Sequence, residues 1–510
     1  MAETRIARAV FEIPPFPGAK PFDHVRSAKS ADTLPSPRAL LTALRQQRLG
    51  GTFWQDRQVL AAGSSAPPDD AAYTADDPQA FLDAIAGRKV HVKGQGPFSG
   101  LSEQTPGAPE TERLLEDLVA RFLLEDVRYC SPFTGEPIGA LELVTLFAEW
   151  RELLDANRSI AAAFGFAGWK RDTVHPLLWG GRPVPFLPAT PEALDGIAEG
   201  AAVAVWKARV PAPFLSKVEA GPWRVLEVED GFIRSAGLGA DCIPPLSIVA
   251  DDLGVHYDPS RPNRLEEMLA LAAFPPAALA RAQKLREWIV KEGIGKYGVG
   301  APLPTQRADR AKRHLLVVGQ VEDDRSVQFG GGDVRSNLEL LQRVRASAPD
   351  AWIIYRPHPD VEAGHRTGGI PQRLVLEIAD AIEPSRPISA LIRMVDEVHV
   401  ITSLAGFEAL LHGKIVTTHG TPFYAGWGLT TDRGRAVPRR RRQRTIDELV
   451  AAVLLDYPRY LDPVTNLPCP AEMLIVRLIS GVQRQNFALV PVRRLLGWTR
   501  RASAQILGLR

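Results

Sequence analysis

The sequence predicts an α/β protein in which two doubly wound halves face each other across a cleft. From about residue 151 onward, short apolar runs alternate with helical patterns, which is typical of parallel sheets covered on both faces. A stretch rich in Pro, Gly and charge, residues 295–313, divides these runs into two groups. In order, the runs are AVAVWKA (202–208), RVLEVED (224–230), HLLVVGQ (314–320), AWIIYRP (351–357), VDEVHVITS (395–403) and KIVTTHG (414–420).

Length and composition describe an ordinary globular protein with several domains. The 510 residues exceed a typical single domain, and 45% are hydrophobic and 24% charged. The net charge of +2 argues against a nucleic-acid-binding protein with a wholly basic surface. Positive charge is concentrated in residues 433–444, with seven arginines and no acid, and in the last 27 residues, with six more arginines. Such runs are either solvated faces or local positive fields.

The cysteine pattern and the lack of long apolar runs predict a cytoplasmic location. Cys130, Cys242 and Cys469 form no CxxC pair, and no secretory leader pattern opens the sequence. No apolar run approaches the roughly 20 residues of a membrane-spanning helix. We therefore expect a cytoplasmic protein that is soluble or bound peripherally to a membrane.

An internal repeat sets the predicted domain plan. Residues 114–135 and 445–466 align without a gap, and both read as an amphipathic helix followed by a proline-marked turn. A Pro-Phe echo, GQGPFSGL against HGTPFYAGWGL, precedes each copy. The predicted domains are the remnant of a first module at 1–150, a complete module with halves at 151–310 and 311–485, and a basic amphipathic tail at 486–510.

Polar residues cluster where the predicted strands end. In open α/β sheets, ligands bind beyond the carboxyl ends of the strands, so these exits are candidate sites. Four exits carry such residues: Glu229 and Asp230 after the second run, Gln320, Asp323 and Asp324 after the third, Arg356 and His358 after the fourth, and Thr402 and Ser403 after the fifth.

Two of these exits suit a phosphate. Thr402 and Ser403 precede a helical pattern, where hydroxyls are ordinary N-caps but where free backbone N–H groups also bind anions. His358 lies between two prolines, which end the strand and restrict the direction of the imidazole. On the opposing half, Asp230 or Glu229 would act as base or nucleophile toward a phosphate-activated donor. The simpler explanations are helix capping, a satisfied histidine and surface ion pairs.

Signatures of other chemistries are missing. The sequence has no GxxxxGK[ST], complete GxGxxG, GxSxG or HExxH pattern, and GGGDVRS at 330–336 is a weak glycine loop. No cluster of metal-ligating residue types stands out, so we expect neither a metal nor a resident cofactor.

Seven motifs occur in a recognisable order over about 151–480. They are EDGFIRSAGLG (229–239), PPLSIVADDLGVHYD (244–258), RPNRLE (261–266), GQVEDDRSV (319–327), YRPHPDV (355–361), TSLAGFEALLHGK (402–414) and GTPFYAGWGLTTD (420–432). In order and spacing they resemble the capsule polysaccharide β-Kdo transferases of the KpsC type, where Kdo is 3-deoxy-D-manno-oct-2-ulosonic acid. The resemblance implies a GT-B-like glycosyltransferase that uses CMP-Kdo and helps to build the β-Kdo linker between a phosphatidylglycerol-type lipid acceptor and a capsular polysaccharide. A bacterial protein of this kind would be cytoplasmic or bound peripherally to the inner membrane.

The resemblance also implies roles for the motif residues. The acidic-acidic-glycine motif of this family supplies the catalytic carboxylate, here Asp230, beside Glu229 and Gly231. Its His-Pro and Ser/Thr motifs hold the CMP phosphate and nucleoside, and their members here are His358, Pro359, Thr402 and Ser403. Related β-Kdo transferases retain configuration through a covalent intermediate on the aspartate, whereas sialyltransferases with the same motifs invert. We expect the retaining course.

Further substrate-binding residues complete the predicted site. The carboxylate of the donor sugar needs a cationic or hydroxyl partner, and Arg234 and Ser247 are the candidates. The rest of the predicted substrate-binding set is Gln320, Asp323, Asp324, Arg356 and Glu408.

The chain departs from the family pattern in two places. Residues 1–150 contain neither an acidic-acidic-glycine motif nor a His-Pro pair, so we expect that segment to be inactive. Arg356 replaces the usual lysine before Pro-His-Pro, which keeps the positive charge but changes the shape of the charged group.

The tail at 487–510 interleaves apolar residues with arginines, and either lies on an anionic membrane surface or packs on the core.

Two other functions remain open on the sequence. One is transfer of a polyol phosphate from a CDP-activated donor, which Arg-Pro-His-Pro stretches also suit. The other is a non-catalytic partner in capsule assembly or export. The acidic-acidic-glycine motif favours Kdo transfer over the first, and the joint presence of Asp230, His358 and Ser403 argues against the second.

Overall fold

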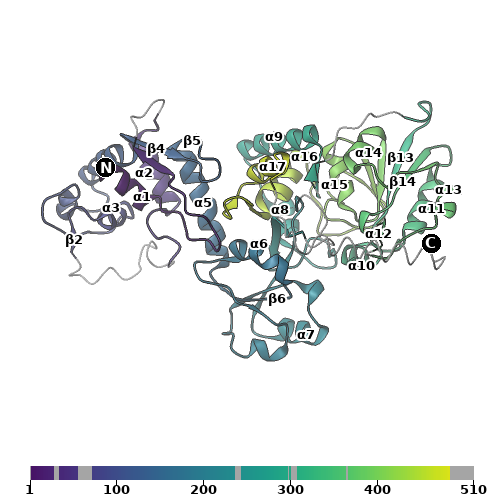
Figure 1. The fold of residues 1–510 in the computed structure, drawn as a ribbon, viewed down its shortest axis with the longest axis horizontal. Coiled ribbons are helices and arrows are strands. Elements are labelled where there is room, and N and C mark those ends of the chain that lie inside the picture. The colour runs from purple at the N-terminus through teal and green to yellow at the C-terminus, as the bar shows by residue number, and fades with distance from the viewer. Residues whose placement is uncertain are drawn as a thin grey trace. The chain divides into compact units, whose positions relative to one another are not determined.

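The chain forms two compact units (Figure 1). The computed structural model describes residues 2–27, 34–55, 72–235, 243–296, 298–299, 307–362, 364 and 366–482. The N-terminal unit comprises residues 1–160, 178–184 and 465–467, and the second unit comprises the rest of the chain. The basic tail predicted at 486–510 lies outside the described residues. Among the helices of the described ranges, none is long and apolar enough to cross a membrane.

The N-terminal unit packs helices against a small antiparallel sheet of order β1-β4-β5, and a second pair of strands, β2 and β3, runs parallel. Its strands are β1 (Val25–Ser27), β2 (Tyr73–Thr74), β3 (Val92–Lys93), β4 (Val127–Cys130) and β5 (Pro137–Ile138). Its helices are α1 (Ala2–Val10), α2 (Pro37–Gln46), α3 (Pro78–Ile85), the 3₁₀ helix η1 (Ser99–Glu103), α4 (Pro109–Val119), the π-helical turn η2 (Ala120–Leu124) and α5 (Ala140–Asn157).

The first half of the second unit is built on a seven-stranded sheet of order β20-β19-β10-β9-β8-β6-β7. Its strands are β6 (Ile160–Phe164), β7 (Phe186–Leu187), β8 (Ala202–Val205), β9 (Arg224–Asp230), β10 (Ser247–Asp251), β19 (Pro458–Leu461) and β20 (Pro468–Cys469). Its helices are α6 (Gly168–Leu178), η3 (Pro191–Leu194), η4 (Lys207–Arg209), α7 (Ala212–Ala220), α8 (Arg264–Leu271), α9 (Pro276–Glu292), α16 (Ile446–Val450), the π-helical turn η6 (Ala451–Asp456) and α17 (Ala471–Ile479).

The second half is built on a six-stranded sheet of order β15-β14-β13-β16-β17-β18, in which every adjacent pair is parallel. Its strands are β13 (His314–Val318), β14 (Trp352–Arg356), β15 (Ala381–Ile382), β16 (Glu397–Val400), β17 (Ile415–Thr418) and β18 (Thr431–Asp432). Its helices are α10 (Arg325–Gly330), α11 (Asn337–Ser347), α12 (Pro359–Glu362), α13 (Gln372–Leu376), α14 (Ile388–Met394) and α15 (Leu404–Leu411). A hairpin of β11 (Ile294–Gly295) and β12 (Gly298–Val299) precedes it.

The predicted strands of the second unit are confirmed, and the prediction of parallel sheets holds only in part. All six apolar runs form strands, and the six-stranded half is wholly parallel. In the other sheet β8 and β9 are parallel, but β10, β19 and β20 pair antiparallel. A parallel return to β10 would need a crossover helix, and the described residues between β9 and β10 contain none.

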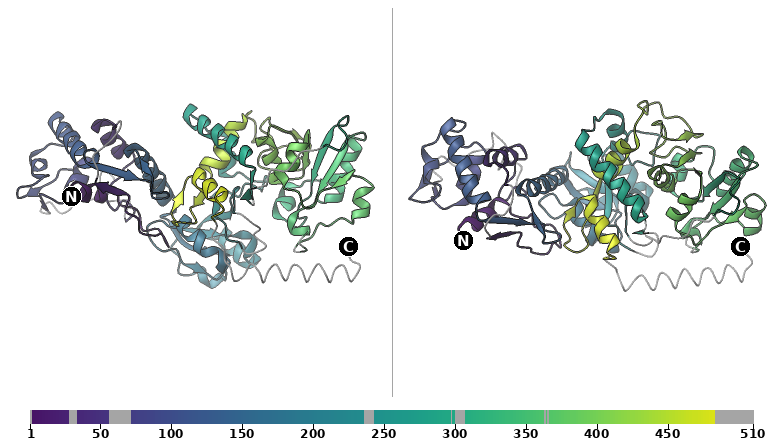
Figure 2. Two further views of the ribbon diagram at one scale, coloured as in Figure 1. Left: turned by 45° about the horizontal axis from the view of Figure 1, so that its top comes forward. Right: turned by 90° about the horizontal axis from the view of Figure 1, so that it is seen from above.

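The C-terminal segment of the second unit returns to the first half. The predicted boundary at 311–485 places residues 445–482 with the six-stranded half. In the structure β19 pairs with β10 instead, and α16 and η6 lie along α9. In Figures 1 and 2 the yellow-green C-terminal elements accordingly lie on the teal α9. The order of elements along the chain therefore does not show that the last helices and strands belong to the first half.

The internal repeat is also a structural repeat. η2, β4, β5 and α5 each begin 331 residues before η6, β19, β20 and α17. In both copies a tyrosine hydroxyl donates to the carbonyl at the end of the π-helical turn, Tyr129 to Leu123 and Tyr460 to Leu454, at 2.8 Å each. The turn after the strand has a positive φ in both copies, 77° at Gly135 and 61° at Asn466.

The arginine-rich stretch 433–444 is in part a buried strap between β18 and α16. Arg440 and Arg444 are buried, and Arg439 and Arg440 both pair with the buried Glu266 of α8, at 2.5 and 3.1 Å. Arg444 donates to the carbonyls of Leu269 and Ala272 at the end of α8. A solvated face does not describe Arg440 and Arg444, because both are buried. All three arginines are paired with acids, Arg439 and Arg440 with Glu266 of α8 and Arg444 with Glu448 of α16.

Glu266→Gln tests the strap. Removing the carboxylate leaves two arginine charges without their partner, so we expect the free energy of unfolding to fall by about 3 kcal/mol in urea denaturation. Glu267→Gln is the matched control, because this neighbour forms an exposed pair with Arg264 and should change the same quantity by less than about 1 kcal/mol. Equal effects of the two substitutions would contradict a buried strap.

Candidate functional site

A cavity of about 1050 Å³ lies between the two sheets of the second unit. That volume is at the upper end for ligand sites, and a nucleotide-sized ligand would fit. Its lining comes from both halves. The first half supplies Trp169, Lys170, Trp206, Glu229, Asp230, Gly231, Arg234, His256 and Tyr257, and the second supplies Gln320, Asp323, Asp324, Arg325, Arg356, His358, Pro359, Thr402, Ser403 and Glu408, among others.

The carboxylate of Asp230 is held between two cations at the end of β9. Nε of the fully buried Arg234 donates to Oδ2 at 2.8 Å. Nζ of Lys170 lies 3.4 Å from Oδ1, and the Asp230 side chain is 20% exposed. Each carboxylate oxygen therefore faces its own positive charge.

The two neighbouring acids have pKa values shifted in opposite directions. Burial by itself would raise the pKa of Asp230, but Arg234, Lys170 and Lys296 outweigh it and hold that pKa well below its usual range. Burial, together with the charge of Asp230, raises the pKa of Glu229. Opposed shifts of this kind mark candidate acid–base pairs. Asp230 is therefore anionic at neutral pH, whereas Glu229 is closer to the pH at which its protonated and ionised forms are equally populated than an ordinary glutamate is.

Gly231 allows the chain to turn directly after Asp230. Its backbone N–H donates to the carbonyl of Ser247 at 3.0 Å, and a Cβ at Gly231 would lie 2.3 Å from the Ser247 Oγ. Only glycine permits that approach. The Ser247 hydroxyl is fully buried and donates to the carbonyl of Ile233, so it does not line the cavity. Its predicted contact with the donor therefore has no support in this geometry.

In the second half, Gln320 joins two strand exits. Its Nε2 donates to the Thr402 hydroxyl at 3.1 Å, and its Oε1 accepts from the Thr402 backbone N–H at 2.8 Å. The hydroxyl of Ser403 caps α15 by accepting from the Ala405 N–H, and Asp324 caps α10 in the same way through Ser326. The capping explanation is therefore correct for Ser403, and the N-terminus of α15 still opens into the cavity.

The ring of His358 is fixed by the backbone as well as by its flanking prolines. The Asp360 N–H donates to Nδ1 at 3.1 Å, so in the neutral ring the proton lies on Nε2. Burial lowers the pKa of His358. His358 therefore presents a neutral N–H donor to the cavity, which suits a phosphate oxygen.

The remaining predicted residues line the cavity but differ in what they bind. The guanidinium of Arg356 donates to the carbonyls of Pro357 and Pro384. Oδ1 of Asp323 accepts from Arg366 and from Thr367. The Glu408 carboxylate accepts from the Lys296 N–H at 3.0 Å. Arg356 and Asp323 thus hold loop residues in place.

Lys170 and Lys296 are cavity residues that the sequence reasoning missed. Lys170 follows β6, whose sequence IAAAF is rich in alanine, a helix former, and therefore carries little strand signal. Lys296 lies in the glycine-rich divider, and no strand exit pointed to it. His256 and Tyr257 belong to the motif PPLSIVADDLGVHYD and follow β10, so the exit of that strand is the sequence signal that points to them.

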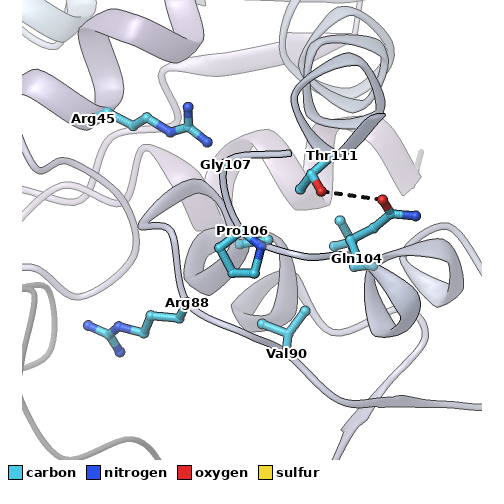
Figure 3. A pocket seen from close by; sticks show the side chains of 9 residues that line it. Arg45, Arg88, Val90, Gln104, Pro106, Gly107 and Thr111 are labelled. Atoms are coloured by element: carbon cyan, nitrogen blue, oxygen red, sulfur yellow. Dashed lines mark hydrogen bonds between the residues drawn. The ribbon is translucent and has the colours of Figure 1, made fainter. Parts of the chain in front are cut away.

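The described residues offer no obvious place for a metal. Within the described ranges, no group of three or more His, Cys, Asp or Glu side chains is arranged to hold a metal ion. A pocket in the N-terminal unit, lined by Arg45, Arg88, Gln104 and Thr111 among others, has a volume of about 10 Å³ (Figure 3). That is room for about one water molecule.

Sequence comparisons find one matching family and three similar relatives. Residues 202–460 match a family described as capsule polysaccharide biosynthesis protein. Capsule polysaccharide modification protein LipA of Neisseria meningitidis serogroup B is 34% identical over 82% of this chain and 61% of LipA, and that of serogroup A is 37% identical over 73% and 53%. Lipopolysaccharide-processing protein LpsZ of Rhizobium meliloti is 37% identical over 68% of this chain and 80% of LpsZ. The chain thus spans little more than half the length of the LipA proteins.

Two solved structures are similar in both fold and sequence. The β-Kdo 2,7 transferase of Thermosulfurimonas dismutans KpsC matches with a TM-score of 0.52 and 34% identity, over 63% of this chain and 99% of that one. The β-Kdo 2,4 transferase of the same KpsC matches with a TM-score of 0.55 and 31% identity, over 62% and 98%. These similarities confirm the predicted GT-B-like α/β fold and the resemblance to KpsC-type proteins.

The contact between Gly231 and Ser247 can be tested by a double-mutant cycle. Gly231→Ala places a Cβ against Ser247, so we expect it to lower the free energy of unfolding by about 1–3 kcal/mol. Ser247→Gly makes room, so the double substitution should cost at least about 0.5 kcal/mol less than the sum of the two single ones. Additive effects in urea denaturation would show that the two residues do not restrict each other.

Glu408→Gln tests the half-buried carboxyl of α15 that lines the cavity. Burial raises the pKa of Glu408 to about 7, from an ordinary 4.5. Between these values the unfolded chain releases the proton before the folded one does, so stability should fall as pH rises from 4.5 to 7. Glu408→Gln removes that loss. Unfolding followed at pH 5 and pH 8 should therefore show a smaller difference for the variant than for the wild type, and an unchanged difference would refute the raised pKa.

Proposed function

Because the chain belongs to the capsule polysaccharide biosynthesis protein family, we propose that it is a glycosyltransferase that moves Kdo from CMP-Kdo to a lipid-linked acceptor. The observation that carries this proposal is the placement of an anionic aspartate in one cavity with the N-terminus of α15 and a neutral histidine, groups that suit a phosphate. Asp230 lies on the first wall, and His358 and Ser403 lie on the other. The KpsC transferases named above, with their Kdo activity, support the choice of sugar.

The second half would hold the nucleotide. The phosphate of CMP would meet the N–H groups at the start of α15 and the Nε2–H of His358, two neutral donor sets that favour an anion. The same contacts would stabilise the charge that develops on the phosphate when the sugar leaves. Lys296 adds a positive charge to the same cavity.

Asp230 would then act at the reacting carbon. Two cations lower its basicity, so it is poorly suited to take a proton from an acceptor and better suited to attack carbon. In the first step Oδ1 of Asp230 bonds to C2 of Kdo while the C2–O bond to the phosphate breaks, and the electron pair leaves on CMP. In the second step the acceptor hydroxyl bonds to C2, and the C2–Oδ1 bond breaks to restore the carboxylate. In the second step the proton of the acceptor hydroxyl passes to Glu229, whose raised pKa suits it as a base near neutral pH.

The two displacements at C2 together retain the configuration of that carbon.

Asp230→Asn provides the direct test. Purified protein is given CMP-Kdo and a lipid-linked glycan acceptor of the phosphatidylglycerol type, and both CMP release and acceptor growth are followed. We expect the variant to lose on the order of 10⁴-fold in rate, as enzymes do when a nucleophile is removed. Without acceptor, intact-protein mass spectrometry should show one Kdo residue added to the wild type alone.

The control is Asp252→Asn, because Asp252 forms an exposed pair with Arg264 and should leave the rate unchanged. Activity of Asp230→Asn close to that of the wild type would exclude Asp230 as the catalytic carboxylate. Turnover of a CDP-activated polyol in place of CMP-Kdo would overturn the choice of donor, and no CMP release from wild type would leave the chain without the proposed activity.

A further inference from the structure

Lys170 is a buried lysine on the cavity wall, and the carboxylate with which it pairs, that of Asp230, lies at a long distance for an ion pair. Its Nζ lies 3.3 Å from the centroid of the Trp206 ring and 3.4 Å from Oδ1 of Asp230. Lys207, one residue after Trp206, is buried to the same degree but is neutralised by Glu227 and Glu219 at 2.5 and 2.6 Å. Burying a charge is costly unless it is closely paired. Lys207 is closely paired and Lys170 is not.

The ammonium of Lys170 has donor capacity to spare. It carries three N–H groups, and within the described residues it makes one hydrogen bond, to Asp230. The indole of Trp206 attracts the charge but accepts no conventional hydrogen bond. Since Lys170 lines the cavity, its remaining N–H groups are available to a ligand there.

Arg234 contacts the same carboxylate, but each of its three nitrogens already donates a hydrogen bond inside the fold. Its Nε donates to Asp230, one terminal nitrogen donates to Ser235, and the other donates to the carbonyl of Ile243, all at 2.8 Å. The residue is 0% exposed. Arg234 therefore serves Asp230 and its own turn.

The chemistry of a 2-keto sugar acid requires a cation at this place. Its reacting carbon, C2, carries a carboxylate directly, so an attack by Asp230 brings two anions together. Like charges repel strongly in a cavity of low dielectric. A cation beside the attacking oxygen relieves that repulsion, and Lys170 is the cation beside Oδ1. A sugar without the carboxylate would not need it.

We propose that Lys170 binds the carboxylate of the donor sugar and is the residue that selects a sugar acid over an uncharged sugar. The inference rests on the proposed function, since it assigns a specificity within the same site. In the free protein Lys170 pairs loosely with Asp230, and in the donor complex it bridges Oδ1 and the sugar carboxylate.

The test compares two donors, CMP-Kdo and its analogue in which the C1 carboxylate is a carboxamide. We expect the wild type to prefer the acid in kcat/KM, and Lys170→Met to reduce that preference by at least about 10-fold, the scale of a lost hydrogen bond to a charged group. The dissociation constant of CMP alone should not change, because the nucleotide contacts lie on the other half. Lys170→Arg keeps the charge and should retain part of the preference.

Lys207→Met is the matched control for removing a buried lysine from the same region, and should leave the preference unchanged in the protein that folds. If Lys170→Met does not fold, Lys170→Gln, which stays polar, takes its place in the comparison. Loss of activity by the same factor on both donors would overturn the inference, because Lys170 would then act only through Asp230. A wild type without preference would overturn it as well, whereas a wild type that turns over neither donor would refute the proposed function itself.

Discussion

The candidate site depends on one half-buried carboxylate, that of Asp230, which stays ionised because two cations flank it. Burial by itself would raise the pKa of Asp230 and so favour its neutral form, which can neither attack carbon nor stabilise positive charge. Arg234 is in turn fixed by the turn that follows β9, and that turn depends on the close approach of Gly231 to Ser247. β9, the turn after it and α6 thus together supply the partners of one side chain. Burying charges in this way costs stability, and such costs are typical of functional sites.

Much of the second unit's fold could be predicted from local patterns, because buried parallel strands rich in Val and Ile are visible in the sequence. The antiparallel edge could not. β10 and β19 are 213 residues apart at their first paired residues, Ser247 and Tyr460, and nothing local in either segment announces that partner. The alanine-rich β6 was missed for the opposite reason, since its residues favour a helix and only its place in the sheet makes it a strand.

The site was predictable to the extent that its residues sit at strand exits. Asp230, His358 and Ser403 follow strands with strong signals, and the structure brings all three to one cavity. Lys170 and Lys296 depend on elements without such signals. Ser247 shows the opposite case: it was predicted to bind the donor because it lies in a specific motif, but its hydroxyl donates to the Ile233 carbonyl inside the fold. Motifs identify which segments matter, and only the packing tells which atoms of those segments face a ligand.

The pairing of β19 with β10 has a consequence for how the second unit is assembled. The chain leaves the seven-stranded sheet after β10 and α9, builds the six-stranded half, and comes back at α16, which lies against α9. Topologically, the six-stranded half is a domain inserted into the first half, and the points where the chain leaves and re-enters the first half, α9 and α16, are neighbours. A domain inserted in this way can be added or removed without breaking the sheet that receives it. The N-terminal unit fits this description. Its β1 pairs with β4 in the register that β10 takes with β19, yet only 104 residues separate Val25 from Tyr129. The N-terminal unit therefore resembles the first half of the second unit with most of the inserted domain missing.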